Sequence, residues 1–466
     1  MRKPQSEREF SLNQHTDPDY SCAYVIIGTK NGRKGYGLTF TLGNGTEIVV
    51  QAVHSMAHLI LKKNAGRIFQ NFARTWRELT SDSQLRWVGP EKGVVHLATA
   101  AIVNALWDLW ARLEKKPLWK LLCDMDPETL VSTIDFRYIT DLVTPDECVQ
   151  FLNESRHLRQ TREEELKSRG YPAYTTQVGW LGYSHDKTEA LCKEFMKKGF
   201  SAFKIKVGKD VTEDIKRCQL VRRVIGPDNL LASKIITVML DANQKWDVEE
   251  ALTWMRHLTD FKPFWIEEPT SPDDILGHVT ISKIKERRKA VVIGVWGLGV
   301  TRKNLLLSAN SAQFSSQQSL NPLGVKVATG EMCANRVMFK QFLQAGGVQI
   351  CQIDSARIGG VNEILAVYFM AKKLNVPVCP HAGGVGLCEM VRHLQFFDYI
   401  CLTGSTEDRM IEFVDQQHEH FEDPALVRMG MYQLPEVPGY SCKFKDDVFE
   451  MYQFPNGKKW RELKKT

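Results

Sequence analysis

Two lysines alternate with apolar residues in the middle of this chain. In the run 203–207, Lys204 and Lys206 would point to one face of a strand and the apolar residues to the other. A strand covered on both sides is normally apolar on both faces, so a lysine pair there is unusual. A solvated pair on an edge strand is the alternative. If the strand is buried, burial, a metal ion and the second ammonium would each lower a lysine's pKa, so that one lysine can act as a base.

Three carboxylates end later apolar runs. Asp241 follows Val238-Met239-Leu240, Glu267 follows Phe264-Trp265-Ile266, and Glu331 ends the run that begins at Val325. The carboxyl ends of parallel strands meet at one rim, where hard oxygen ligands suit Mg²⁺. Glu268 neighbours Glu267 and is expected to point elsewhere. A single such carboxylate is more often a helix cap or an ion-pair partner, but three in succession favour a metal site.

A histidine and an aspartate end two further runs. His381 closes the run 376–381 and Asp354 closes the run 348–354. A carboxylate beside an imidazole can hold one ring nitrogen and leave the other for acid–base chemistry. A lone histidine is more often structural. The pairing with Asp354, opposite Lys206, favours a catalytic role for His381.

Alternating strands and helices must position these side chains. Strand-like runs followed by helical patterns, with ionisable residues at the ends of the strands, predict an α/β fold with a parallel barrel. The repeating pattern is expected to begin at Ile134, and its strands include 174–180, 203–207, 238–241, 264–267, 325–331, 348–354, 376–381 and 399–403. A smaller α+β domain should precede it. That domain would hold a hairpin of 23–27 and 36–41 turned at Asn31-Gly32, and helices near 47–61, 68–79 and 93–113.

These patterns divide the chain into three parts. We predict an α+β domain over 1–130, a barrel over 131–423, and an irregular C-terminal segment over 424–466 that packs back on the body. The barrel carries an insertion at about 284–320, which includes an additional apolar run at 291–300 and a second half rich in Ser, Gln and Asn. We expect this insertion to lie outside the barrel.

Composition excludes several classes of protein. The chain has 466 residues, a net charge of +6 and 43% hydrophobic residues, which is ordinary for a globular protein. Basic and aromatic residues do not interleave in a stripe, so we expect no nucleic-acid partner, and no apolar run suggests a membrane span. The eleven cysteines show no metal-binding spacing, which indicates reduced thiols inside a cell. The cytosol and the mitochondrial matrix both remain open.

The order of the motifs resembles a known family. The motifs are Lys-x-Lys at 204–206, Asp-x-Asn at 241–243, Ile-Glu-Glu-Pro at 266–269, Ala-Thr-Gly-Glu at 328–331, Ile-Asp at 353–354 and Pro-His-Ala-Gly-Gly at 380–384. Together they resemble the mandelate-racemase branch of the enolase superfamily. Longer segments, such as 15–20, 86–93, 265–277 and 379–389, are more similar to the L-fuconate dehydratases and their mitochondrial animal members. The resemblance extends over nearly all of 15–457.

This resemblance implies a fold and an activity. The fold would be a modified (β/α) TIM-type barrel with an α+β N-terminal capping domain. The reaction would convert L-fuconate to 2-keto-3-deoxy-L-fuconate, by removal of the proton alpha to the carboxylate and loss of the 3-hydroxyl. The substrate is a small acid sugar, the location mitochondrial, and a homo-oligomer is possible. A catalytically silent scaffold or binding protein, and a dehydratase or racemase for another acid sugar, are the alternatives.

The resemblance also assigns roles to residues. Lys206 would be the base and His381 the acid, with Asp354 beside it. Mg²⁺ would bind Asp241, Glu267 and Glu331. The substrate contacts would be Tyr20, Lys204, Asn243, His381 and Glu412. The chain departs from the family's pattern in three places: 1–14 does not resemble the usual first strand and glycine-rich loop, a few extra residues lie near 233–238, and the insertion at 284–320 is unusual.

Overall fold

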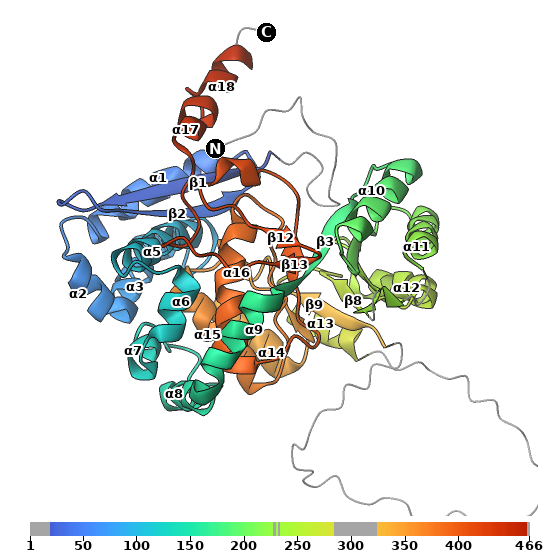
Figure 1. Ribbon diagram of the computed structural model, residues 1–466, viewed down its shortest axis with the longest axis horizontal. Coiled ribbons are helices and arrows are strands. Elements are labelled where there is room, and N and C mark those ends of the chain that lie inside the picture. Colours follow the sequence, from blue (N-terminus) through green and yellow to red (C-terminus); the bar gives the residue numbers. More distant parts are fainter. Residues whose placement is uncertain (1–18, 227–229, 232–233, 284–323, 464–466) are drawn as a thin grey trace, which may run out of the picture.

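The computed structural model describes residues 19–226, 230–231, 234–283 and 324–463 (Figure 1). The expectations about the missing first strand, the insertion at 284–320 and its apolar run therefore lie outside the described residues. Within them, an N-terminal layer of a hairpin and helices packs against a parallel α/β body.

The N-terminal capping domain is built on one hairpin and one long helix. Strands β1 (Ser21–Gly28) and β2 (Lys34–Thr41) pair antiparallel, as predicted. The helices are α1 (Thr46–Met56), η2 (Ala57–Leu59), α2 (Ala65–Gln70), α3 (Phe72–Thr80), α4 (Leu85–Val88) and α5 (Gly93–Leu113). Helix α5 packs so closely against β2 that a Cβ added at Gly37 would lie 2.3 Å from the Ala101 carbonyl oxygen. The glycine, which has no side chain, therefore allows the two backbones to approach at this point.

Helix α5 is apolar enough over its 21 residues to span a membrane by composition. The sequence analysis expected no such stretch. However, 83% of the qualifying window is buried inside the protein. A helix that is surrounded by protein on nearly all sides is apolar on nearly all sides, so α5 is the core helix of the capping layer.

Four helices and a 3₁₀ turn connect the capping domain to the barrel. They are α6 (Leu118–Asp124), α7 (Pro127–Ser132), α8 (Pro145–Glu154), η3 (Arg156–Leu158) and α9 (Arg159–Arg169). The prediction of a strand near Ile134 is wrong, because the chain there runs through turns between α7 and α8. Thr144 and Glu147 form a capping box that starts α8. The first barrel strand begins only at Tyr171.

The barrel alternates strands and helices. Its strands and the helices between them are β3 (Tyr171–Gly179), α10 (His185–Lys197), β4 (Ala202–Lys206), α11 (Val211–Ile225), β7 (Thr237–Asp241), α12 (Val248–Leu258), η4 (Thr259–Phe261), β8 (Trp265–Glu267), α13 (Ile275–Ser282), β9 (Lys326–Thr329), α14 (Arg336–Ala345), β10 (Ile350–Cys351), α15 (Val361–Lys373), α16 (Leu387–Phe397) and β11 (Ile411–Phe413). The short strands β5 (Leu230–Leu231) and β6 (Lys234–Ile235) pair antiparallel in a separate two-stranded sheet before β7.

The strands pair in parallel in chain order. The sequence β3-β4-β7-β8-β9-β10 continues through single bridges from Cys351 to Val378 and from Asp354 to His381. Strand β11 pairs in parallel with β3, so the last strand meets the first. Parallel pairing in this order, with helices outside, is the expected (β/α) barrel.

Side chains inside the barrel form two levels. A compact apolar cluster fills the barrel below the rim, and its members are Tyr174, Ala202, Met239, Trp265, Ala328, Ile350 and Cys379. Strand register aligns Lys206 with Asp241 and Asp241 with Glu267, one level nearer the carboxyl ends. The polar residues therefore stand on a packed floor at the rim.

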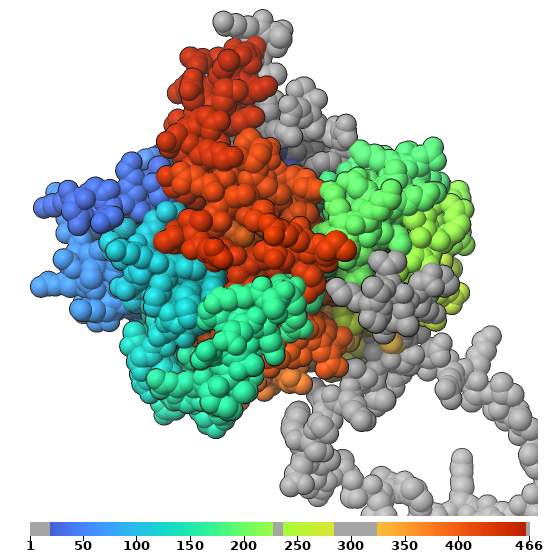
Figure 2. Space-filling view, in the orientation of Figure 1, coloured from blue at the N-terminus to red at the C-terminus, as the bar shows by residue number. Residues whose placement is uncertain are grey.

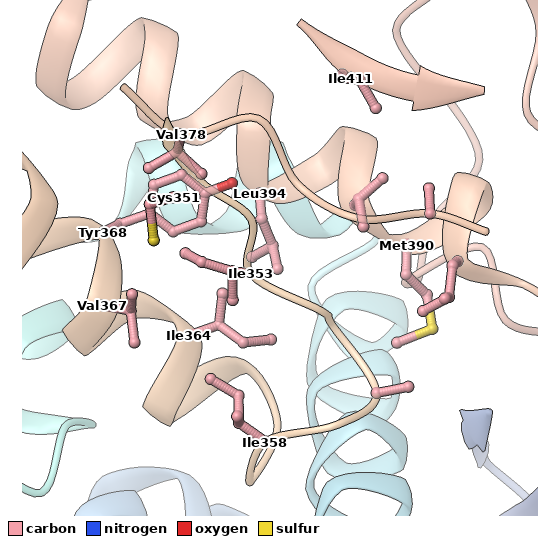
Figure 3. Close-up of a cluster of buried hydrophobic side chains, with 14 of the residues drawn as sticks. Cys351, Ile353, Ile358, Ile364, Val367, Tyr368, Val378, Met390, Leu394 and Ile411 are labelled. Atoms are coloured by element: carbon pink, nitrogen blue, oxygen red, sulfur yellow. The ribbon is translucent and has the colours of Figure 1, made fainter. Parts of the chain in front are cut away.

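A second apolar cluster packs the strands against the outer helices (Figure 3). Ile353 and Ile358 of the segment after β10 belong to it, with Ile364 and Val367 of α15 and Leu394 of α16. The prediction of a strand at 399–403 is wrong: α16 continues into the π-helical turn η5 (Asp398–Thr403). This apolar stretch is buried in the same way as a strand, and hydrophobic pattern alone does not separate a short buried helix from a strand.

The C-terminal segment returns to the capping domain. It contains η6 (His418–His420), β12 (Val427–Arg428), β13 (Met431–Tyr432), α17 (Asp446–Tyr452) and α18 (Lys458–Leu463). The Tyr24 hydroxyl donates to the Cys442 carbonyl, the Leu118 amide donates to the Gly439 carbonyl, and the Tyr440 amide donates to Asp108. Figure 2 shows this red segment lying across the face between the N-terminal and barrel regions. We call 435–445 the C-terminal strap.

Candidate active site

Strand β4 carries the two lysines into the barrel. All five of its residues are buried. The Lys204 ammonium lies 2.5 Å from Glu267 Oε1, 3.0 Å from Glu412 Oε1 and 3.5 Å from Asp241 Oδ2. The Lys206 ammonium donates a hydrogen bond to Asp241. The lysine pair therefore faces the barrel interior, as the alternation predicted, and not solvent.

The charges around the lysines oppose the expected pKa change. Burial lowers the pKa of Lys206 and the Lys204 ammonium adds to this, but the charges of Asp241, Glu331 and Glu267 together outweigh both, so the pKa is raised. Burial likewise lowers the pKa of Lys204, and Glu267 and Glu412 raise it well above its ordinary value. The sequence analysis expected the lysine pKa values to be lowered. They are raised because each ammonium has a carboxylate partner in this structure, which stabilises its charged form.

The carboxylates at this rim have unequal pKa values. Burial raises the pKa of Asp241, but Lys206 and Lys204 outweigh it and bring the pKa to about 2. Burial and the neighbouring Asp241 charge raise the pKa of Glu267 to about 8, although Lys204 opposes them. Glu267 also accepts from the indole of Trp265 at 3.1 Å and from the amide of Gln352 at 2.7 Å. Two carboxylates this close favour a shared cation or proton.

Glu268 belongs to the same cluster. It was expected to point elsewhere, and that expectation is wrong: burial and the charges of Glu331 and Asp241 raise its pKa well above the ordinary value. Its backbone has a left-handed φ of 42°. One carboxyl oxygen accepts from Gln244 at 2.9 Å, and the other, Oε1, is buried without a hydrogen-bond partner. Positive φ at a non-glycine residue and an unpaired buried oxygen are both costly, and such features gather at functional sites.

The donor set suits a hard divalent cation. Asp241, Glu267, Glu268 and Glu331 supply oxygens only, and their mutual charge effects show that they are close. Among the residues the structure describes, no three His, Cys, Asp or Glu side chains are already arranged as a metal cage. Asp241 and Glu267 are instead paired with lysines. The unpaired oxygen of Glu268 and the excess of buried carboxylates fit a cation of charge +2.

His381 and Asp354 form a close pair across the site. His381 Nδ1 lies 2.7 Å from Asp354 Oδ2, and Nε2 lies 3.4 Å from Glu331 Oε2 and 3.8 Å from Glu412 Oε2. Burial lowers the pKa of His381, but Glu331, Asp354 and Glu412 outweigh it and raise the pKa to about 10. The neighbouring carboxylates therefore favour the protonated ring, which suits a proton donor.

One pocket brings the polar groups together. Its lining combines residues of the barrel rim with residues of the capping hairpin, namely Tyr20, Phe40, Leu42, Thr176, Trp180, Lys206, Asn243, Glu331, Met332, Arg357, His381, Gly383 and Glu412. Of the ten residues chosen from the sequence, six line it. Lys204, Asp241 and Asp354 lie behind this lining and contact Glu412, Lys206 and His381 in it. Glu267 lies behind Lys204 and contacts it.

Asn243 and Tyr20 are positioned to meet a ligand. Asn243 has a left-handed φ of 45°, and both polar atoms of its buried side chain lack a hydrogen-bond partner. Tyr20 comes from the capping domain, stacks on Phe40 with ring centroids 5.7 Å apart, and hydrogen-bonds Gln416. Both residues line the pocket, and their contacts with a substrate stay a prediction.

Sequence reasoning missed several pocket residues. Thr176 is buried near the end of β3, and its hydroxyl has no hydrogen-bond partner. Phe40, Leu42, Trp180 and Met332 form apolar parts of the lining. Thr176 could have been found from its place near the end of a barrel strand. The apolar residues carry no such signal, because their types are equally common in a core.

Comparisons with known proteins agree with this geometry. A family model described as "Mandelate racemase / muconate lactonizing enzyme, N-terminal domain" matches residues 2–123. A second model, described as "Enolase C-terminal domain-like", matches residues 187–294 and 309–448. One model therefore matches the capping domain and the other matches the barrel.

Individual proteins are similar over nearly the whole chain. Mitochondrial enolase superfamily member 1 of Xenopus laevis is 53% identical over 451 residues, which is 96% of this chain and 92% of that protein. L-galactonate dehydratase of Hypocrea jecorina is 46% identical over 442 residues, covering 95% and 89%. The crystal structure of human mitochondrial enolase superfamily member 1 superimposes with a TM-score of 0.89 at 50% identity, covering 99% of this chain and 96% of that one.

Proposed function

Since the chain belongs to the mandelate racemase / muconate lactonizing enzyme family of the enolase superfamily, we propose that it is a magnesium-dependent dehydratase that converts L-fuconate to 2-keto-3-deoxy-L-fuconate. The observation that supports this most is the pocket itself. Lys206 and His381 line the same cavity, with the buried carboxylates of Asp241 and Asp354 beside them. A base and an acid that face one substrate can remove a proton and a hydroxyl from neighbouring carbons.

Lys206 removes the proton from C2 in this mechanism. The C2–H bond breaks and its electron pair moves towards the carboxylate, which creates an enediolate. To accept a proton, Lys206 must first lose its own ammonium proton to solvent, so the Asp241 carboxylate that stabilises the ammonium has to be drawn away from it when substrate binds. Lys204 stays charged between Glu267 and Glu412, and its ammonium stabilises the negative charge that develops on the carboxylate.

His381 donates a proton to the departing 3-hydroxyl. The C3–O bond breaks, water leaves, and the enol product becomes the 2-keto-3-deoxy acid. Asp354 holds Nδ1 of the ring, so that Nε2 faces the pocket. Tyr20, Asn243 and Glu412 bind substrate hydroxyls or the carboxylate, and Asn243 and Glu412 belong to the barrel rim while Tyr20 belongs to the cap.

Asp241, Glu267 and Glu331 are the residues that would hold Mg²⁺, with Glu268 close by. When bound, the cation stabilises negative charge on the substrate carboxylate and so makes the C2 proton more acidic. Solved structures with 19% identity and a TM-score of 0.67 include an L-talarate/galactarate dehydratase of Salmonella typhimurium liganded with Mg, which shares the fold. The carboxylate cluster of this chain supports the same ion here.

The apolar lining favours L-fuconate over L-galactonate. L-Fuconate ends in a methyl group, whereas L-galactonate carries a hydroxymethyl group at the same position. Phe40, Leu42, Trp180 and Met332 give the pocket an apolar wall against which a methyl group would be buried favourably. A hydroxyl placed there would lose its water unless it found a partner. By analogy with its relatives, we also propose a mitochondrial location.

A direct assay separates this proposal from its alternatives. Purified protein would be titrated with Mg²⁺ and supplied with L-fuconate, L-galactonate and other acid sugars, and the 2-keto product would be measured. We expect Mg²⁺-dependent product and a higher kcat/KM for L-fuconate than for L-galactonate. Product from another acid sugar alone would move the assignment within the class. No product and no exchange of the C2 hydrogen would favour a silent scaffold.

Two variants then test the division of labour. Lys206→Ala should abolish both C2 hydrogen exchange in D₂O and dehydration, because no enediolate forms. His381→Asn should reduce dehydration about 10²- to 10⁴-fold, the usual contribution of a general acid, while Lys206 still exchanges the C2 proton. Wild-type exchange in Lys206→Ala would exclude Lys206 as the base. Equal loss of exchange in both variants would remove the separate role of His381.

A further inference from the structure

The segment that connects Asp354 to α15 is a buried loop. Residues 354–360 adopt turns and bends, and all of them except Arg357 are buried. A buried loop cannot satisfy its backbone groups with water, so each N–H and C=O needs a partner from the protein. The partners of this loop show what holds its shape. We call residues 354–360 the dyad loop, because it carries the aspartate of the His381–Asp354 pair.

The capping domain supplies three of those partners. The Thr39 hydroxyl on β2 donates to the Ala356 carbonyl at 2.6 Å, and the Asn104 amide on α5 donates to the Ser355 carbonyl at 3.1 Å. The indole of Trp76 on α3 donates to the Gly359 carbonyl at 2.7 Å. Thr39 and Asn104 are fully buried. A carbonyl that lost its donor in this interface would stay buried and unsatisfied, which is unfavourable.

The same loop orients the Asp354 carboxylate. Its Oδ1 accepts from the backbone N–H of Ala356 at 2.7 Å and of Arg357 at 2.9 Å, while Oδ2 is bound to His381. The direction of Oδ2 therefore depends on where the Ala356 and Arg357 amides lie. The Ala356 residue that donates to Asp354 through its N–H is the residue that Thr39 holds through its carbonyl.

These contacts form a chain from the cap to the proton donor. Thr39 fixes Ala356, Ala356 and Arg357 fix one oxygen of Asp354, and the other oxygen fixes His381. We propose that Thr39 and Asn104 are positioning residues for the His381–Asp354 pair, so that the capping domain sets the geometry of the protonation step. This rests on the proposed role of His381. The capping domain would then position the proton donor as well as line the pocket. Loss of its contact with the dyad loop should impair protonation of the 3-hydroxyl and leave removal of the C2 proton intact.

The effect should fall on dehydration. Misplacing a reacting group by about 1 Å can cost on the order of 100-fold in rate. We therefore expect Thr39→Val, which keeps the side-chain shape but removes the hydroxyl, to reduce the dehydration kcat about 10- to 100-fold. Exchange of the C2 hydrogen should stay within about twofold of wild type, because no hydrogen bond among the described residues joins Lys206 or Asp241 to Thr39, Asn104 or Ala356. KM for L-fuconate should change little.

The test is the ratio of C2 exchange to dehydration, measured in one sample with Mg²⁺ and L-fuconate in D₂O. A sample that is partly unfolded loses both rates equally, so the ratio reports positioning and not folding. Thr39→Ser keeps the hydroxyl and should restore a ratio near wild type. Trp107→Phe is the matched control: it lies one turn after Asn104 on α5 and loses a buried 2.7 Å bond to Asn362 of α15, outside the dyad loop. Its ratio should stay that of wild type.

Each outcome has one meaning. The proposal is supported if the ratio of exchange to dehydration is raised in Thr39→Val, near that of wild type in Thr39→Ser, and unchanged in Trp107→Phe. If His381→Asn raises the ratio but Thr39→Val does not, the positioning role is excluded while the proposed function stands. If Thr39→Val lowers both rates equally, Thr39 has a purely structural role and the proposal is overturned. If His381→Asn itself leaves the ratio unchanged, the failure lies in the proposed function.

Discussion

Glu363 should make the contact between the capping domain and the barrel sensitive to acid. This α15 carboxylate is buried between the two domains. Its Oε2 lies 2.6 Å from His96 Nε2 of α5 and accepts from the Gly359 amide at 2.6 Å, and its Oε1 lies 3.1 Å from Arg336 Nη1. Burial raises the pKa of Glu363, but His96 and Arg336 outweigh it and bring the pKa to about 2.

The magnitude follows from this pKa. A fall from 4.5 to about 2 corresponds to roughly 3.5 kcal/mol of stability, at about 1.4 kcal/mol per pH unit. Because the folded pKa is the lower one, the contribution is complete above about pH 4.5. It is lost as pH falls towards 2, and about 2 kcal/mol of it should be gone at pH 3. Protonation of Glu363 would remove one of the two negative charges that pair with the buried Arg336.

Urea unfolding at pH 7 and pH 3 measures this contribution. Glu363→Gln should be destabilised at pH 7 by about 3 kcal/mol, since it removes one of the two carboxylates that pair with the buried Arg336. Its loss of stability between pH 7 and pH 3 should be about 2 kcal/mol smaller than that of wild type. Glu154→Gln, an exposed carboxylate on α8, is the control and should follow wild type. If Glu363→Gln loses stability with pH as steeply as wild type, the assigned pKa of Glu363 is wrong.

Three further predictions concern the site and the insertion. Asp354→Asn should resemble a weaker His381→Asn, with dehydration reduced about 10-fold and C2 exchange largely kept, because the ring is misoriented but present; equal loss of both rates by NMR would contradict this. Glu331→Gln should weaken Mg²⁺ binding in calorimetry and reduce both exchange and dehydration, and an unchanged Mg²⁺ affinity would exclude it as a ligand. Deleting 284–320 should keep or raise the melting temperature, because β8, which precedes this stretch in the sequence, pairs directly with β9, which follows it. Loss of cooperative unfolding on deletion would show that the segment is an integral part of the fold.

Much of the rim could be predicted because strand alternation is a strict rule. The period of two placed Lys204 and Lys206 on one face, and the structure has both inside the barrel. Helix α5 runs from Gly93 to Leu113, the same bounds that its apolar spacing predicted. The pairing of His381 with Asp354 also followed from their places at neighbouring strand ends.

The errors arose where apolar character alone was used. The stretches near Ile134 and at 399–403 are apolar because they are buried, and both are turns or helix in the structure. The direction of Glu268 could not be predicted, because its left-handed backbone breaks the alternation that would have turned it away. Strand β11 is only three residues long, so Glu412 was found through the family resemblance and not through periodicity.

The C-terminal strap has a consequence for how the chain folds. Tyr24 bonds a residue 418 positions later in the sequence, and Asp108 bonds one 332 positions later. Contacts that close such long loops form late and slowly, since the entropy of closure must be met first. On the ribosome, the capping layer emerges first but lacks its last partners until the barrel has been synthesised. A chain that stops short of the strap should therefore leave the hairpin and α5 exposed, and we expect such truncated products to be aggregation-prone even though every barrel residue is present.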